Sequence, residues 1–175
     1  MATLTYENGT LEIPADPKLL HSMTAAVTES LTMCDAKTKF VGLSAAPIHE
    51  PGSVTGVIGV HGKVSGFITV NMAEQVALKL ATGFLQEQFD KIDNQVVDGV
   101  GEVTNLIAGG IKKRLAGTTW GFDAVTVPSV IIGRNYQIAY TKGLQYLVCT
   151  FEHENEEAYL LEHRLLHVAL SLLRL

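Results

Sequence analysis

The sequence lacks the features of a secreted or membrane-spanning protein. It has two cysteines in 175 residues, Cys34 and Cys149, and no CxxC spacing. Both lie in apolar settings, which predicts buried free thiols rather than a disulfide or a redox pair. No apolar run approaches the roughly 18 residues of a transmembrane helix, and the first residues lack the basic start and apolar block of a signal peptide. We therefore expect a cytoplasmic protein.

Positive charge is also scarce. Thirteen Lys and Arg residues against 18 Asp and Glu residues give a net charge of -5, which argues against nucleic acid and against an anionic membrane as partners. Neither GxGxxG nor GxxxxGK[ST] occurs, and no serine sits in a GxSxG turn, so the common nucleotide-binding and hydrolase motifs are missing. What is present is a hydrophobic fraction of 47% in a chain whose length suits one domain.

The order of apolar patterns predicts an α+β fold, with helices packed on a largely antiparallel β-sheet in a single domain, residues 1–175. Apolar residues at helical spacing indicate helices, and runs rich in branched and aromatic residues indicate strands. The expected helices are residues 17–34, 71–88 and 93–115, and the expected strands are residues 40–46, 54–60, 63–72, 124–133, 136–140, 144–151 and 158–165.

Polar residues mark where each expected helix begins. Asp16 stands directly before a proline, which is typical of an N-cap followed by the first helical residue. Asn71 is followed three residues later by Glu74, a capping-box pattern that would begin the second helix. Asp90 or Asp93 would cap the third helix.

The two ends of the chain leave alternatives open. Residues 1–15 predict either two short strands around the turn Asn8–Gly9 or a frayed arm. Residues 166–175 fit either a strand or a short helix.

The third expected helix, Asp93–Leu115, has two different faces. With about 100° of turn per residue, Glu102, Asn105 and Gly109 fall within about 40° of Asp98. The opposite side carries the apolar residues Val96, Val100, Val103, Ile107 and Ile111. On spacing alone, the polar stripe is an ordinary solvated helix face. Glycines at four positions of the helix weaken it, which indicates that another surface must come close.

The polar residues nevertheless form a recognisable pattern. Asp98 is followed after three residues by Glu102, after two more by Asn105, and after another twenty-two by Pro128. This spacing resembles the signature of the CheC/CheX/FliY family of chemotaxis phosphatases, in particular its single-site, CheX-like members. The run EVTNLIAGGIKKRL resembles the family's active-site helix, and TGVIGVHGKVSGFITVNM resembles the segment before it. The resemblance covers about residues 17–165.

The resemblance implies a phosphatase that hydrolyses the aspartyl-phosphate of a phosphorylated CheY-like response regulator. Asn105 would orient the attacking water, and Glu102 would anchor the partner by pairing with a lysine. Asp98 would bind the partner through a hydrogen bond, although it also fits an ordinary exposed residue. Gly109 and Pro128 would shape the surroundings of the site. The protein would need no cofactor of its own, because the regulator supplies the aspartate, a lysine and Mg²⁺.

The resemblance also bears on the number of sites and on partners. Some relatives carry two motif helices, but here the first helix has Glu29 with Thr32 where asparagine would be needed, and Ala25 where Asp or Ser would stand. We therefore expect one site per chain and, as in single-site relatives, a homodimer. The alternative function is a non-catalytic module of the same fold that binds a response regulator or a flagellar switch component.

A second polar pattern points to a metal site only weakly. His163 and His167 are four residues apart, but the HExxH order and a clear third ligand are missing. On a strand the two histidines would be about 13 Å apart, too far for one ion. We expect no metal site.

Overall fold

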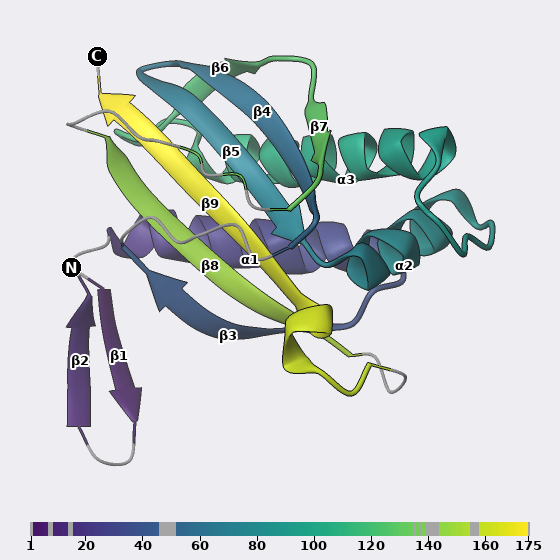
Figure 1. The fold of residues 1–175 in the computed structure, drawn as a ribbon. Coiled ribbons are helices and arrows are strands. Elements are labelled where there is room, and N and C mark those ends of the chain that lie inside the picture. The colour runs from purple at the N-terminus through teal and green to yellow at the C-terminus, as the bar shows by residue number, and fades with distance from the viewer. Residues whose placement is uncertain are drawn as a thin grey trace.

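The computed structural model describes residues 2–6, 9–13, 16–45, 52–134, 136, 138, 144–154 and 158–174. Figure 1 shows the arrangement of the helices and strands within these residues. The helices are α1 Pro17–Met33, α2 Glu74–Leu85, α3 Asn94–Leu115 and the short 3-10 helix η1 Leu161–Arg164. The strands are β1 Ala2–Tyr6, β2 Gly9–Ile13, β3 Thr38–Ser44, β4 Val54–Gly62, β5 Val64–Met72, β6 Phe122–Val125, β7 Ser129–Ile132, β8 Gln145–His153 and β9 Leu165–Arg174.

One antiparallel sheet forms the centre of the described chain. Its strand order is β3-β8-β9-β5-β4-β6, and β7 also pairs with β4. The helices α1, α2 and α3 pack together on one face of this sheet (Figure 1). The expected α+β architecture is therefore confirmed. At the N-terminus β1 and β2 form a separate antiparallel pair, which agrees with the two-strand alternative; Asn8 of the expected turn lies outside the described residues.

The tail of the chain is the central strand of the sheet. β9 pairs with β5 on one side and β8 on the other, so that Leu166 lies opposite both Met72 and Phe151. Its residues Leu166, Val168, Leu170 and Leu172 are buried. The expected strand at 158–165 is wrong, because Leu161–Arg164 is a 3-10 helix. The strand between β5 and β8 is instead β9, which begins directly after this 3-10 helix.

Asn71 does not cap α2, so the expected capping box is wrong. Asn71 is fully buried in β5, where its Oδ1 accepts from the Gly52 amide at 2.8 Å and its Nδ2 donates to Thr55 Oγ1 at 2.7 Å. The side-chain amide of Asn71 thus forms hydrogen bonds with buried polar groups in β4 and just before it. The helix begins at Glu74 without a side-chain cap and ends at Leu85, three residues earlier than expected.

The other two helix starts follow the sequence. Asp16 accepts from the Lys18 amide at 2.8 Å, and Asp93, not Asp90, accepts from the Val96 amide at 3.0 Å. Asp16 also accepts from Trp120 Nε1 at 2.9 Å, and this bond lowers the pKa of the carboxyl. Because Trp120 follows α3, the bond ties the end of α3 to the start of α1.

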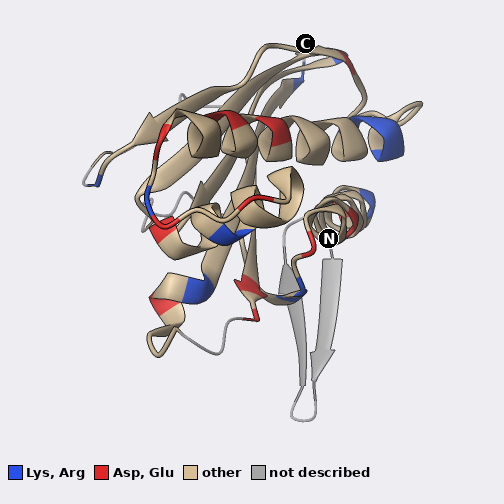
Figure 2. Cartoon of the chain, turned by 90° about the vertical axis from the view of Figure 1, so that its right-hand side faces the viewer, with Lys and Arg blue, Asp and Glu red and all other residues tan. Residues whose placement is uncertain are grey.

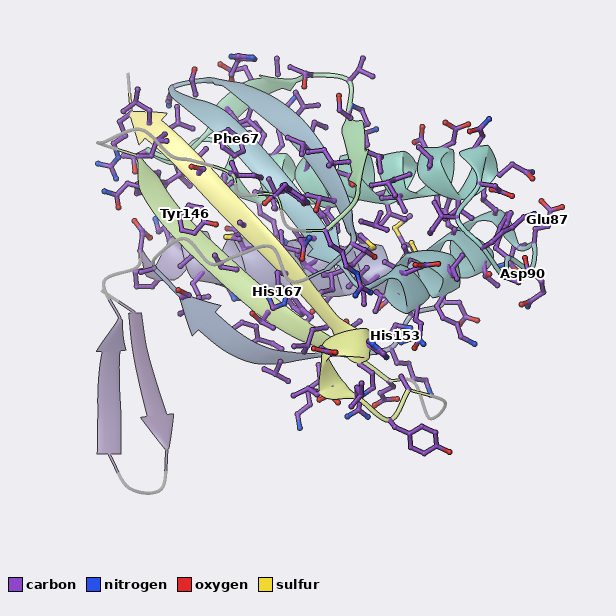
Figure 3. All side chains as sticks on the ribbon, viewed as in Figure 1. Phe67, Glu87, Asp90, Tyr146, His153 and His167 are labelled. Carbon is purple, nitrogen blue, oxygen red and sulfur yellow. The ribbon has the colours of Figure 1, made fainter. Side chains whose placement is uncertain are left out.

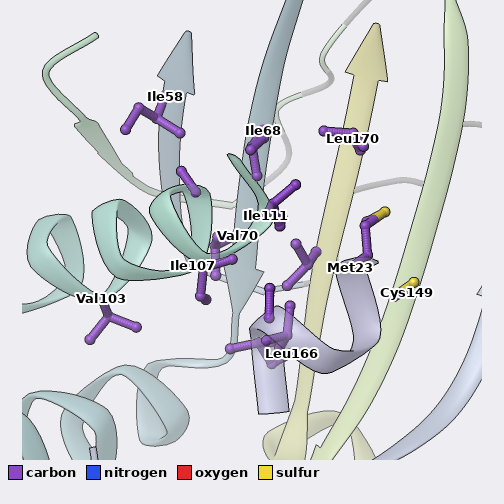
Figure 4. Packing of buried hydrophobic residues seen from close by; sticks show 14 of the residues in the cluster. Met23, Ile58, Ile68, Val70, Val103, Ile107, Ile111, Cys149, Leu166 and Leu170 are labelled. Atoms are coloured by element: carbon purple, nitrogen blue, oxygen red, sulfur yellow. The ribbon is translucent and has the colours of Figure 1, made fainter. Parts of the chain in front are cut away.

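The core lies between the helices and the sheet. In Figure 4, Val103, Ile107 and Ile111 of α3 lie among Met23 of α1 and the sheet residues. The five apolar residues expected on the buried face of α3 are all at most 1% exposed: Val96, Val100, Val103, Ile107 and Ile111. Cys34 and Cys149 are buried free thiols, as expected, and burial raises their pKa values to about 11 and about 12.

Candidate functional site

Four residues of α3 point away from the core and form an exposed stripe, here named the α3 ridge. It consists of Asp98, Glu102, Asn105 and Gly109, which are all exposed. Since a helix rises 1.5 Å per residue, the ridge is about 16 Å long. The structure thus places on one exposed surface the four residues that the helical repeat predicts to share a face, while the apolar side of the same helix is buried.

Neighbouring helices press closely against one flank of the ridge. A Cβ atom added at Gly99 would lie 3.3 Å from Ala81 Cβ in α2, and one added at Gly110 would lie 3.2 Å from Ala26 Cβ in α1. At Gly109, by contrast, an added Cβ would meet no atom within 4 Å. Two of the helix glycines therefore allow close helix packing, as expected, whereas Gly109 leaves the ridge open.

The other flank is bordered by the connection between β6 and β7. A Cβ atom at Gly101 would lie 3.7 Å from Pro128 Cγ, so Pro128 packs beside the ridge next to Glu102. Below the helix, Gly56 of β4 leaves the space that the Thr104 side chain fills, because a Cβ there would clash with Thr104 Oγ1. The ridge is thus carried on a helix held on both flanks and from beneath.

The polar groups of the ridge are not used inside the protein. Within the part of the chain that the structure describes, the side chains of Asp98, Glu102 and Asn105 form no hydrogen bond or ion pair. Figure 2 shows acidic positions along the first half of α3 and basic positions at its end. A carboxylate and a carboxamide one turn apart on a rigid helix could enter the same cleft of a partner. The carboxamide could accept a hydrogen bond from water at any pH.

The corresponding residues of α1 are already engaged. Glu29 forms an ion pair with Arg114 of α3, and Arg114 lowers the pKa of the Glu29 carboxyl. Thr32 Oγ1 donates to the Thr28 carbonyl at 2.8 Å, within its own helix. The exposed side of α1 therefore offers no free acid and amide pair at these positions.

The two histidines of the weak metal pattern lie in different elements. His163 belongs to η1, while His167 lies in β9 on the sheet face away from the helices (Figure 3), where its Nδ1 is 3.0 Å from Thr150 Oγ1. Burial lowers the pKa of His167. Among the described residues, no three His, Cys, Asp or Glu side chains are placed to hold a metal ion. The helices in the described ranges include none with the combined length and apolar character of a membrane span.

A basic hollow at the end of α3 was not expected from the sequence. It has a volume of about 260 Å³, and its charged lining residues are Lys63, Lys112, Lys113 and Asp123. The sequence shows Lys112 and Lys113 as a basic end of the helix. Lys63 lies beside them only because the β4–β5 turn is folded against this end of α3. No local signal in the sequence could have shown this.

Known proteins match both the sequence and the fold. Residues 54–152, more than half of the chain, match the family model of the chemotaxis phosphatase CheX. The CheY-P phosphatase CheX of Thermotoga maritima is 25% identical over 115 residues, which are 65% of this chain and 74% of that protein.

Two solved structures show the same fold. A CheC-like superfamily protein from Shewanella sp. PV-4 has a TM-score of 0.74 and 23% identity over 90% of this chain and 99% of its own. The CheX–CheY–BeF3–Mg²⁺ complex from Borrelia burgdorferi has a TM-score of 0.67 and 24% identity over 89% of this chain and 96% of its own. With its CheC-like fold and its match to the family model, the chain belongs to the CheX family of chemotaxis phosphatases.

Proposed function

We propose that this protein accelerates hydrolysis of the aspartyl-phosphate of a CheY-like response regulator, with the α3 ridge as its active surface. The observation that carries the proposal is that Glu102 and Asn105 are exposed on one face of α3 and have no partner among the described residues. An exposed acid and amide on a helix fixed from three sides can be inserted into another protein without rearrangement. Membership in the CheX family supports the choice of substrate.

Asn105 is proposed to orient the attacking water. Phosphoryl transfer from an acyl phosphate needs little besides positioning and charge stabilisation. The Asn105 carboxamide suits this task because its oxygen accepts a hydrogen bond from water and it has no charge to repel the phosphoryl group. Glutamine has the same role in GTPases.

Glu102 is proposed to anchor the partner rather than to act as a base. A carboxylate close to a phosphoryl group would repel it, whereas a carboxylate paired with a lysine of the regulator forms a charge-assisted hydrogen bond. Asp98, one turn earlier on the ridge, would add a hydrogen bond to the same partner. Gly109 and Pro128 would contribute shape, since Gly109 leaves space and Pro128 packs against Gly101.

The reaction would need no cofactor bound to this chain. We propose that Mg²⁺ belongs to the regulator, where carboxylates hold it next to the phosphoryl group. The Borrelia burgdorferi structure, which contains CheX, CheY, BeF3 and Mg²⁺ together, supports a ternary arrangement of this kind.

The test is an assay of phosphate loss from an acyl-phosphorylated CheY-like regulator with Mg²⁺, measured against the regulator's own decay. Wild-type protein should accelerate the loss. Asn105→Ala should lower kcat by about a hundredfold, because one positioning group is worth about 3 kcal/mol. Asn94→Ala, the same change in the first turn of α3, is the matched control.

Two results would count against the proposal. A folded Asn105→Ala variant with normal activity would refute the role of Asn105. If the wild-type protein bound the phosphorylated regulator without accelerating its decay, the non-catalytic binding module would be the correct function.

We also propose that the protein forms a homodimer through its sheet. Among the described strands β3 stands at the end of the strand order and pairs with β8, and an edge strand is a common place for pairing between chains. Light scattering at micromolar concentration should give twice the mass of the 18.9 kDa chain. A monomer would refute this proposal and leave the phosphatase assignment untouched.

A further inference from the structure

The charges along α3 divide into two ends. The carboxylates of Asp98 and Glu102 lie in the first half of the helix, and Lys112 and Lys113 lie in its last turn (Figure 2). Lys112 and Lys113 follow Asp98 by 14 and 15 residues, which places them within about 60° of it around the helix. The lysines therefore continue the line of the α3 ridge and reverse its charge.

Helix stability explains two of the three lysines at this basic end but not Lys63. Lysines near a helix C-terminus interact favourably with the helix dipole, which is a sufficient reason for Lys112 and Lys113. Lys63 comes from the turn between β4 and β5, yet it lines the same hollow of about 260 Å³. Within the described chain none of the three lysines has an ion pair, and Asp123 is the single acidic residue in the lining. The hollow thus carries unbalanced positive charge in a chain whose net charge is -5.

The lysines lie close enough to Asn105 to fall within an interface of ordinary size. Lys112 is seven residues beyond Asn105, which is about 10 Å along the helix axis. A standard interface covers about 800 Å² on each partner, equivalent to a disc of about 16 Å radius. An interface of this size centred on Asn105 therefore also covers the basic end of α3.

We propose that Lys63, Lys112 and Lys113 form a second docking point, which binds an acidic patch on the phosphorylated response regulator. This inference rests on the proposed function and adds the chemistry of the partner. The regulator presents a lysine to Glu102 and acidic side chains to the basic hollow. Opposite charges at the two ends of the ridge allow one orientation along α3 and repel the reverse one, since like charges in an interface cost several kcal/mol. The lysines are docking residues and take no part in the chemical step.

The experiment measures kcat and KM for the phosphorylated regulator with charge-reversed variants. Lys63→Glu is the decisive single change, because Lys63 lies outside the helix and its reversal leaves the α3 dipole interactions intact. The double variant K112E/K113E should show the larger effect. The control K37E/K39E changes the net charge by the same amount as the double variant, on exposed residues before and within β3. Light scattering verifies that this control keeps the oligomeric state of the wild-type protein. Thermal unfolding of each variant verifies that it is folded.

We expect KM to rise about threefold for Lys63→Glu and about tenfold for K112E/K113E at low salt, with kcat unchanged, because rim charges act on association. The difference from wild type should shrink as salt is raised toward 0.5 M, where screening shortens the range of these charges. The proposal is overturned if the folded lysine variants have the KM of K37E/K39E, or if kcat falls while KM stays constant. If wild-type protein gives no acceleration at all, the proposed function has failed instead, and the two failures are distinguishable.

Discussion

The helices α1 and α3 lie side by side on the same face of the sheet and bury the same kind of apolar surface, yet their exposed sides differ. Both carry a glutamate followed three residues later by a polar residue, Glu29 with Thr32 and Glu102 with Asn105. In α1 the glutamate is paired with Arg114 and the threonine is bonded to its own helix. In α3 both groups are free among the described residues.

The difference shows that a similar local pattern has different uses depending on what lies within reach. Arg114 projects from the last turn of α3 toward α1 and neutralises Glu29. No cation of the described chain pairs with Glu102, so its carboxylate remains available for a partner. The side of a helix that can act on another protein is the one its own neighbours leave unsatisfied.

The largest expected difference between α1 and α3 appears when each glutamate is removed in turn. Glu102→Ala should raise KM for the phosphorylated regulator about ten- to hundredfold, because a hydrogen bond between charged groups contributes about 1.5–3 kcal/mol. Glu29→Ala should leave kcat and KM at their wild-type values. Steady-state kinetics of the two variants would contradict our interpretation if both lost activity equally.

The packing of α1 against α3 should respond to the two adjacent glycines differently. Gly110→Leu forces a large side chain against Ala26 and should lower the free energy of unfolding by about 2 kcal/mol. At Gly109 an added Cβ meets no atom within 4 Å, so Gly109→Leu should not destabilise the protein. Urea unfolding midpoints measure both effects. Equal midpoints for the two variants would mean that α1 and α3 are not in close contact at Gly110.

The start of α1 should be more sensitive than the start of α3. Asp16 caps its helix and also bonds Trp120, whereas Asp93 only caps. Asp16→Ala should therefore cost about 1–2 kcal/mol of stability, and Asp93→Ala about 1 kcal/mol. Thermal or urea unfolding would show whether this order holds; a larger loss for Asp93→Ala would contradict the contribution of the Trp120 bond.

The smallest expected effect is that of the ion pair between Glu29 of α1 and Arg114 of α3. Arg114 lowers the pKa of the Glu29 carboxyl, so the folded protein binds this proton less readily than the unfolded chain. The stabilisation from the pair is present above the unfolded pKa and is lost as the pH falls through the lowered folded value. Arg114→Ala should return the pKa of Glu29 toward its ordinary value, which an NMR titration of the carboxyl can follow. An unchanged titration would show that the pair does not form in solution.

Features with a local cause could be read from the sequence. The two faces of α3 follow from the helical repeat, and the start of α1 follows from Asp16, whose side chain bonds amides two and three residues away. For α3 the sequence left Asp90 and Asp93 as alternatives, and the structure selects Asp93. The α+β class followed from the order of such patterns. The motif Asp98, Glu102 and Asn105 could likewise be placed on one exposed stripe, because a helix fixes the angle between residues close in sequence.

Features that depend on distant residues were decided only by the tertiary structure. Asn71 looked like a cap, but buried partners at Gly52 and Thr55 hold it in β5. The tail was ambiguous until β5 and β8 gave it hydrogen-bond partners on both sides. That Arg114 neutralises the glutamate of α1, and that Lys63 joins the basic end of α3, also required the folded chain. Hydrogen bonds, ion pairs and shared hollows join residues far apart in sequence, so no local pattern contains them.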